Sequence, residues 1–238
     1  MKRLALLISL LVTGCVAQRP AAPLPQYPLM DATAALRTLQ ARAARLHTLS
    51  GTCTLVLTRS DGQSIQLDAA VAMAPPDRLR LRAWKANEVV FDLTLLPNGL
   101  WIETADDPRA KSQIVPATLK AAEFSRQLLI FSGGFFDGAS VAVVSPAWFV
   151  FRRDHVYCQV NRSTLTASRY WVVDSSGRTR FTLDLADYSP IDGIPWPMKF
   201  TAIQPGGDRI DIQFDAVNVN STLARGAFIP PRRAEKRS

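Results

Sequence analysis

The sequence predicts a mainly β protein with some α structure, in which a single strongly curved antiparallel sheet of about 11 strands accompanies an N-terminal helix and one inserted helix. Three observations support this fold class. Apolar and polar residues alternate with a period of two over most of the chain. Short turns join the alternating segments, and only one long stretch with helical character interrupts them. We find no internal repeat and no boundary that would divide the body into two domains.

The N-terminus has the features of an export signal. Lys2 and Arg3 precede a nine-residue apolar run at residues 4–12, about half the ~20 apolar residues that a membrane-spanning helix needs. The run ends in Val12-Thr13-Gly14-Cys15, which resembles the bacterial lipobox, where the cysteine is acylated and becomes the mature N-terminus. We therefore expect the first 14 residues to be a lipoprotein signal peptide and Cys15 to be lipidated. Ordinary cleavage near Ala17 is the alternative.

Two segments flank the expected domain at residues 31–229. Residues 15–30 contain four prolines at short intervals, which favours an extended tether that spans on the order of 45 Å. Residues 230–238 carry four basic side chains and one acidic one, and we expect a basic, disordered tail. The formal net charge of the chain is +8. The tail of an exported chain meets anionic lipid headgroups before nucleic acid, and we expect a solvated end rather than a specific contact there. We expect attachment to the membrane through the lipid anchor and no nucleic-acid partner.

The elements of the domain can be placed in order. Asp31 can cap a helix whose apolar positions Leu36, Leu39, Ala43 and Leu46 share one face. An inserted helix is expected over residues 116–131, since Pro116 opens a stretch without turn residues that stops before two glycines. The strands are expected at residues 52–58, 65–73, 78–83, 91–95, 100–104, 148–152, 155–161, 164–174, 178–187, 196–204 and 209–219.

Short motifs occur in a fixed order between residues 31 and 220. They are Leu49-Ser50-Gly51-Thr52-Cys53, Pro76-Asp77-Arg78-Leu79-Arg80-Leu81, Ile114-Val115-Pro116, Ile194-Pro195-Trp196-Pro197-Met198-Lys199-Phe200 and Asp208-Arg209-Ile210-Asp211-Ile212. With the helix that precedes them and the hairpins between them, they resemble the lipoprotein-localisation carrier superfamily of the LolA and LolB type. The resemblance covers most of the chain that would follow Cys15.

This resemblance implies a half-open β-barrel whose concave apolar face, covered by helices, holds acyl chains of a lipoprotein. A half-barrel with a helical lid can leave an apolar volume for a ligand. The alternative for each apolar residue is a place in a packed core. The inward-facing set would be Leu55, Leu57, Leu67, Val71, Met73, Leu79, Leu81, Phe91, Leu93 and Leu95, with Leu119, Phe124, Leu128 and Phe131 as the lid.

Cys15 makes the chain look like the lipid-anchored, LolB-like acceptor branch of this superfamily. The family rule associates Asp at the second mature position with retention in the inner membrane, so Val16 favours the outer membrane, facing the periplasm. In the acceptor branch a hairpin projects an apolar side chain that assists delivery into the bilayer. Trp84, in the expected turn at residues 84–87, matches it by position, and packing over the sheet edge is the alternative. The implied partners are an acylated lipoprotein or lipid and a periplasmic carrier protein, with this chain as a monomer.

The sequence lacks the residue constellations of an enzyme. His47 and His155 are its only histidines, and no Gly-rich phosphate loop or serine elbow occurs, so we expect no catalysis, no cofactor and no metal. Cys53 and Cys158 both take apolar positions of strands, which allows either a disulfide in an oxidising compartment or two buried thiols.

Two functions remain. The protein accepts or inserts lipoproteins or lipids at the outer membrane, or it is a non-catalytic envelope scaffold or sensor that binds a protein or glycolipid partner.

Overall fold

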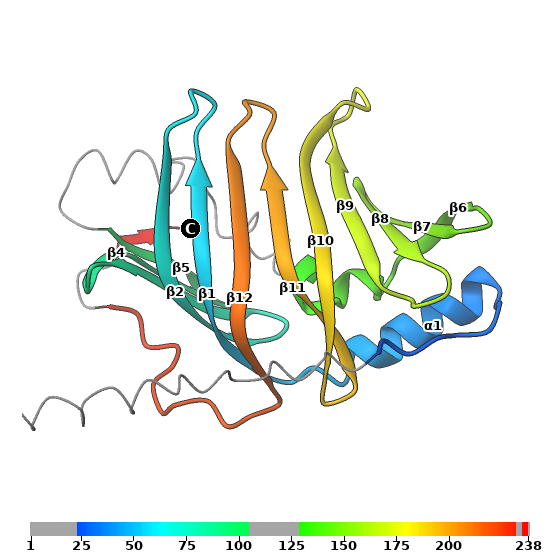
Figure 1. The fold of residues 1–238 in the computed structure, drawn as a ribbon, viewed down its shortest axis with the longest axis horizontal. Helices are drawn as coiled ribbons and strands as arrows, with labels where there is room; N and C mark the ends of the chain where they lie inside the picture. The colour runs from blue at the N-terminus through cyan, green and yellow to red at the C-terminus, as the bar shows by residue number, and fades with distance from the viewer. Residues whose placement is uncertain (1–22, 105–128, 232–234, 238) are drawn as a thin grey trace, which may run out of the picture.

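The computed structural model describes residues 23–104, 129–231 and 235–237. Within these ranges the chain forms one antiparallel sheet, the helix α1 (Ala32–Ala43) and the short 3₁₀ helix η1 (Gly134–Phe136) (Figure 1). The strands are β1 (Leu49–Thr58), β2 (Ser64–Ala74), β3 (Arg78–Lys85), β4 (Glu88–Leu96), β5 (Gly99–Thr104), β6 (Ser140–Val144), β7 (Trp148–Arg153), β8 (Val156–Asn161), β9 (Ala167–Val173), β10 (Thr179–Ile191), β11 (Ile194–Ile203), β12 (Arg209–Val219) and β13 (Glu235–Arg237).

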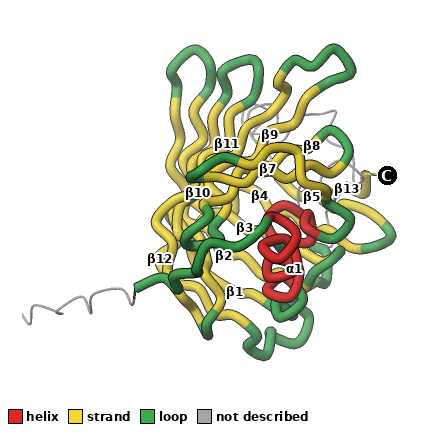
Figure 2. Tube along the Cα trace, turned by 90° about the vertical axis from the view of Figure 1, so that its right-hand side faces the viewer, coloured by secondary structure: helices red, strands yellow, loops and turns green. Residues whose placement is uncertain are grey.

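The sheet is open and strongly curved. Its strand order is β13-β5-β4-β3-β2-β1-β12-β11-β10-β9-β8-β7-β6, so β1 and β12 join the two halves of the chain in its middle. Strand β13 and strand β6 are the two edges, and they do not pair with each other. The helix α1 lies on one side of the curve, near β7 to β10, and the sheet partly wraps around it (Figure 2). The predicted fold class is therefore confirmed.

The described part of the sheet contains 13 strands rather than about 11, because two short edge strands were not predicted. In β6 every residue is exposed, so its sequence lacks the alternation that reveals a half-buried strand. Strand β13 lies in the tail, where Glu235 pairs with Ile102 and Arg237 with Leu100 of β5. The expected disorder of residues 230–238 is therefore wrong for residues 235–237. Main-chain hydrogen bonds on the free edge of β5 need no apolar side-chain pattern.

The helix α1 begins where the sequence predicts. The Asp31 carboxylate accepts a hydrogen bond from the backbone N–H of Ala34 at 2.8 Å and caps the first turn. Ala35 and Leu39, one turn apart, are buried against the sheet. None of the helices in the described ranges is long and apolar enough to cross a membrane.

The helix that the sequence predicts over residues 116–131 falls mostly outside the described ranges. Residues 129–132 are helical and lead to Gly133, whose φ of 75° is a left-handed conformation that favours glycine and ends the helix. A Cβ at Gly133 would also lie 3.2 Å from the Ala43 Cβ, so α1 packs closely over this turn. The turn therefore fixes the position of α1 relative to residues 129–136.

The core is one continuous cluster that runs along the inner face of the sheet. Its aromatic centre connects residues 129–132 with β11 and β12: the Phe200 ring lies 5.3 Å from Phe131 and 5.8 Å from Phe214, measured between ring centroids. A buried ion pair lies in β3 and β4, where Arg80 donates two hydrogen bonds to Asp92 at 2.9 and 2.7 Å. Arg80 also donates to the Ala227 carbonyl at 3.4 Å, which ties the segment after β12 to this strand pair.

Candidate functional site

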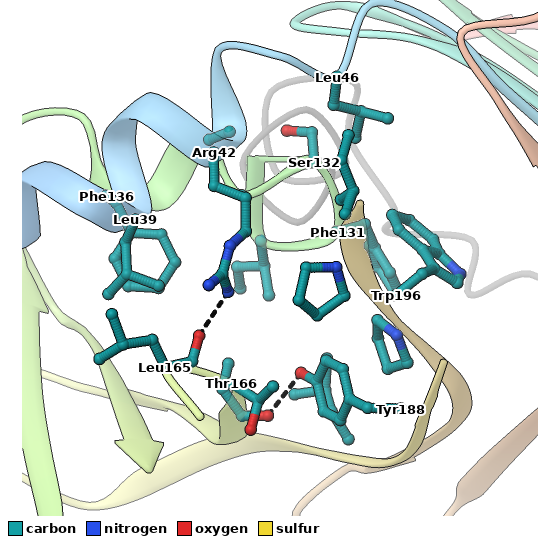
Figure 3. Close-up of a pocket in the computed structure, with 18 of the residues that line it drawn as sticks. Leu39, Arg42, Leu46, Phe131, Ser132, Phe136, Leu165, Thr166, Tyr188 and Trp196 are labelled. Atoms are coloured by element: carbon teal, nitrogen blue, oxygen red, sulfur yellow. Dashed lines mark hydrogen bonds between the residues drawn. The ribbon is translucent and has the colours of Figure 1, made fainter. Parts of the chain in front are cut away.

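A cavity of about 80 Å³ lies between α1, residues 130–136 and the strands β9 to β11 (Figure 3). Most of its lining is apolar, and the lining side chains come from both halves of the sequence. The lining residues are Leu39, Arg42, Ala43, Leu46, Ile130, Phe131, Ser132, Gly133, Phe136, Leu165, Thr166, Ala167, Tyr170, Leu185, Tyr188, Ile194, Pro195, Trp196 and Pro197.

The helix α1 supplies one wall of the cavity, because its apolar residues are spaced so that they lie on one face. Leu39 and Ala43 are four residues apart and therefore lie on the same face, and Leu46 follows just after the helix ends. Two side chains of the helix bond to residues across the cavity. Gln40 donates to the Phe136 carbonyl at 3.0 Å, and Arg42 donates to the Leu165 carbonyl at 2.6 Å. These bonds tie α1 to the residues that face it.

The sheet supplies the opposite wall through alternating positions of its strands. Tyr170, Leu185 and Trp196 come from β9, β10 and β11, which are neighbours in the sheet. Trp196 is 4% exposed and its ring lies 6.1 Å from the ring of Phe200. Trp196 therefore lines the cavity and also packs against the aromatic part of the core.

The polar groups of this cavity are few and mostly satisfied within the protein. The Tyr188 hydroxyl donates to the Ala167 carbonyl at 2.6 Å. Burial raises the pKa of the Tyr170 and Tyr188 hydroxyls, so both rings are neutral at physiological pH. Among the described lining residues, Arg42 is the one with a basic side chain, and its guanidinium points into the cavity (Figure 3).

The structure separates the predicted cavity residues into three groups. Phe131 lines the cavity. Leu119, Phe124 and Leu128 lie outside the described residues. The others belong to β1 to β4 and do not line this cavity: Leu55, Leu67, Met73, Leu79, Phe91, Leu93 and Leu95 are core residues, and Leu57, Val71 and Leu81 are half-buried and packed against them. For this last group a contact with a ligand stays a prediction.

Sequence reasoning missed most of the residues that line the cavity. The face of α1 that carries Leu39 and Leu46 was predicted, but nothing in a single sequence shows which sheet positions oppose it. The sequence places Trp196 in a family motif and at the start of a predicted strand, but it does not show that Trp196 faces α1. Leu165 follows β8 in a turn with a φ of 50°, and no periodicity marks such a position.

Trp84 does not lie in the turn where the sequence placed it. It belongs to β3, where it pairs with Asp68 of β2 and Val89 of β4, and it is half-buried. The turn consists of Ala86 and Asn87, whose φ values of 49° and 69° are those of a two-residue hairpin turn. The placement in the turn is therefore wrong, and a role of Trp84 at a membrane stays a prediction.

Cys53 and Cys158 are free, buried thiols, so the disulfide alternative is wrong. They lie on β1 and β8, which are separated by β12, β11, β10 and β9. Five strand spacings of about 4.8 Å place them roughly 24 Å apart along the sheet, far beyond disulfide reach. Burial raises the pKa of the Cys53 thiol to about 12 and raises that of Cys158 as well. Cys15 lies outside the described residues.

In the described ranges no group of three or more His, Cys, Asp or Glu side chains is placed to hold a metal ion.

Comparison with known proteins shows the fold. No protein-family model matches the sequence, and no curated protein matches it. The fold is similar to that of a LolA superfamily protein from Nitrosomonas europaea, with a TM-score of 0.57 and 12% identity over 81% of this chain and 96% of that one.

Two further solved structures are similar to the same extent. A domain from Vibrio parahaemolyticus, named for a proposed role in outer membrane lipoprotein sorting, has a TM-score of 0.56 and 12% identity over 84% of this chain and 97% of that one. A DUF1329 family protein from Desulfovibrio piger has a TM-score of 0.58 and 12% identity over 82% of this chain and 96% of that one. At these identities the likeness establishes the LolA-type fold.

Proposed function

We propose that this chain, which has the fold of LolA superfamily proteins, is a non-catalytic, lipid-anchored protein that binds an acyl chain between α1 and the sheet. The observation that carries the proposal is the apolar cavity, whose walls come from α1, residues 130–136 and β9 to β11. An apolar cavity with few polar groups is suited to a hydrocarbon ligand. Each CH₂ group transferred into it contributes about 0.8 kcal/mol.

The cavity has to widen to accept such a ligand. Its volume of about 80 Å³ is well below the roughly 300 Å³ at which pockets for small-molecule ligands begin. The described contacts that hold α1 over residues 134–136 and 165 include the Gln40 and Arg42 hydrogen bonds at 3.0 and 2.6 Å. Because these are hydrogen bonds to carbonyl groups and not a continuous strand ladder, α1 can shift without breaking the sheet.

The proposed anchor is the acylated Cys15, with the body held at the periplasmic face of the outer membrane. The proline-rich tether joins the body close to the cavity, where the Tyr27 backbone N–H donates to the Ser163 carbonyl at 2.7 Å. Tyr27 lies twelve positions after Cys15 in the sequence. An extended chain of that length reaches about 37 Å, so the cavity would stay near the bilayer.

In this proposal the protein accepts an acylated lipoprotein or lipid, from a periplasmic carrier, and inserts it at the outer membrane as a monomer. Passing an acyl chain between apolar cavities of increasing affinity needs no nucleotide and no bond cleavage. The LolB-like branch is favoured by Cys15 and Val16.

The edge strand β6 favours a second candidate function, that of a scaffold or sensor for a protein partner. Val143 and Val144 are 54% and 55% exposed, and Trp148 at the start of β7 is 37% exposed. No charged residue occurs between Asp137 and Arg152. An uncharged apolar edge can add a strand from another protein.

Mass spectrometry of the purified protein tests the proposed function. We would use the mature polypeptide, residues 15–238 with Cys15 replaced by Ala, and examine it under native conditions for bound fatty-acyl species. We expect acyl ligand on this protein and much less on Ala167→Leu, which fills the cavity. Ala142→Leu on the exposed face of β6 is the matched control and should keep the ligand.

A ligand-free protein that also fails to take up added dodecanoate would contradict the proposal and favour the scaffold or sensor. Correct sorting of lipoproteins after depletion of the protein would contradict the transport role alone.

A further inference from the structure

Arg42 places a basic side chain in a cavity whose described lining is mostly apolar. It extends from α1 between the apolar side chains of the two walls (Figure 3). Its Nη1 donates to the Leu165 carbonyl at 2.6 Å and its Nη2 donates to the Tyr27 hydroxyl at 3.0 Å. Neither acceptor is a carboxylate.

No carboxylate in the described ranges pairs with Arg42. The ion pairs of these ranges involve other arginines, and the cavity lining contains no Asp or Glu. A guanidinium has five N–H donors, and the hydrogen bonds of Arg42 to the Leu165 carbonyl and the Tyr27 hydroxyl use two of them. A half-buried cation with spare donors beside an apolar volume is suited to an anion that arrives with the ligand.

We propose that the ligand of this cavity is an anionic amphiphile whose acyl tail lies against the apolar walls and whose carboxylate or phosphate headgroup binds the Arg42 guanidinium. This inference rests on the proposed function, because it assumes that the cavity accepts an acyl chain. It adds the chemistry of the headgroup. A planar guanidinium can bind two oxygens of one carboxylate or phosphate, and the low polarity of the walls strengthens that contact.

A purely structural role for Arg42 makes a different prediction. If Arg42 only ties α1 to residue 165, charged and uncharged ligands with the same tail bind equally. The hydrogen bond to Leu165 would then account for the residue completely. The affinities of charged and uncharged ligands with the same tail therefore distinguish the two roles, whereas the stability of the protein does not.

Titration calorimetry at pH 8 tests the proposal on the mature polypeptide with Cys15 replaced by Ala. The ligands are dodecanoate, dodecyl phosphate and 1-dodecanol below their aggregation limits, with acetate and inorganic phosphate as headgroups without a tail. We expect at least one anionic amphiphile to bind about 10- to 100-fold more tightly than dodecanol. Acetate and phosphate should bind at least a hundredfold more weakly than the amphiphiles. The stronger of dodecanoate and dodecyl phosphate identifies the headgroup.

Variants assign this preference to Arg42. In Arg42→Gln the advantage of the anions should fall below about threefold while dodecanol binds as before. In Arg42→Lys part of the advantage should remain, because the charge is kept and the paired donors are lost. Arg37→Gln removes a charge from the exposed face of α1, and Tyr27→Phe removes only the hydroxyl acceptor, so both should keep the full preference.

The outcomes separate this inference from the proposed function. Equal affinity for the three tailed ligands, or an unchanged preference in a folded Arg42→Gln protein, overturns the headgroup assignment and leaves the acyl site in place. If no tailed ligand binds, the proposed function itself fails. Tight binding of acetate or inorganic phosphate, which have no acyl tail, overturns the proposal that the ligand is an amphiphile. If Arg42→Gln does not fold, Arg42→Lys and the wild-type ligand comparison decide.

Discussion

The two halves of the sheet use apolar side chains in different ways. In β1 to β5 the inward side chains pack until almost nothing is exposed: Leu67 is 1% exposed and Leu95 is 0% exposed. Across β9 to β11 the inward side chains face α1 and residues 130–136, and a cavity remains between them. Both halves show the same alternation in sequence. Whether an apolar face closes or stays partly hollow therefore depends on what covers it.

The arginines of the two halves show the same difference. Arg80 donates two hydrogen bonds to Asp92, whose side chain is 4% exposed, and the bond to Asp92 raises the pKa of Arg80. Arg42 faces the cavity and bonds only to neutral acceptors among the described residues. Removing one partner of the buried pair would leave a charge unpaired in the interior, whereas Arg42, which has no carboxylate partner among the described residues, is available to an anionic ligand.

The largest effect should come from breaking the compensated pair. Asp92→Ala leaves the Arg80 guanidinium, only 25% exposed, without its counterion. We expect the free energy of unfolding to fall by about 3 to 5 kcal/mol, measured by urea denaturation. Asp184→Ala is the control, since it breaks the more exposed Arg169–Asp184 pair and should cost less than about 1 kcal/mol. If the free energy of unfolding fell equally in the two variants, the burial of the Arg80–Asp92 pair would not explain its effect on stability.

A slightly smaller effect should come from the packed half of the sheet. Leu95→Ala removes a fully buried side chain and should lower the free energy of unfolding by about 2 to 5 kcal/mol. Because Leu95 does not line the cavity, the folded variant should bind dodecanoate with unchanged affinity in the same titration. A large loss of affinity would show that the two halves do not act separately.

The smallest effect should come from the start of the cavity wall. Asp31→Ala removes the cap of α1, whose bond to the Ala34 N–H is 2.8 Å long, and should cost about 1 kcal/mol. Thermal unfolding followed by circular dichroism measures this loss. Asp31→Asn keeps a capping oxygen and should recover most of it. If neither substitution changed the thermal stability, tertiary contacts alone would hold α1 in place.

The difference between the packed side chains of β1 to β5 and the cavity under α1 also explains which features the sequence could predict. Alternation and turns predicted 11 of the strands and the capped helix after Asp31, because burial on one face of a strand or helix leaves a period in the sequence. The cavity has no such signal. Phe131 and Leu67 are both apolar residues at inward positions, yet of the two Phe131 lines the cavity under α1 and Leu67 does not.

The remaining errors have equally physical causes. The fully exposed β6 has no alternation, and β13 forms through main-chain pairing with β5. The Cys53 and Cys158 positions share an apolar parity, but parity does not report that four strands lie between them. Trp84 was assigned to a turn whose two-residue length becomes visible only in the φ values of Ala86 and Asn87.

The central claim is that the acyl chain binds under α1 and not in the β1 to β5 half. Photo-crosslinking tests it directly, with a dodecanoate that carries a diazirine in its tail and the mature polypeptide with Cys15 replaced by Ala. We predict saturable crosslinks on cavity residues such as Leu39, Leu185 and Trp196, and their loss in Ala167→Leu. Crosslinks on Leu67 and neighbouring residues of β1 to β4, with none on α1 or β9 to β11, would contradict the account.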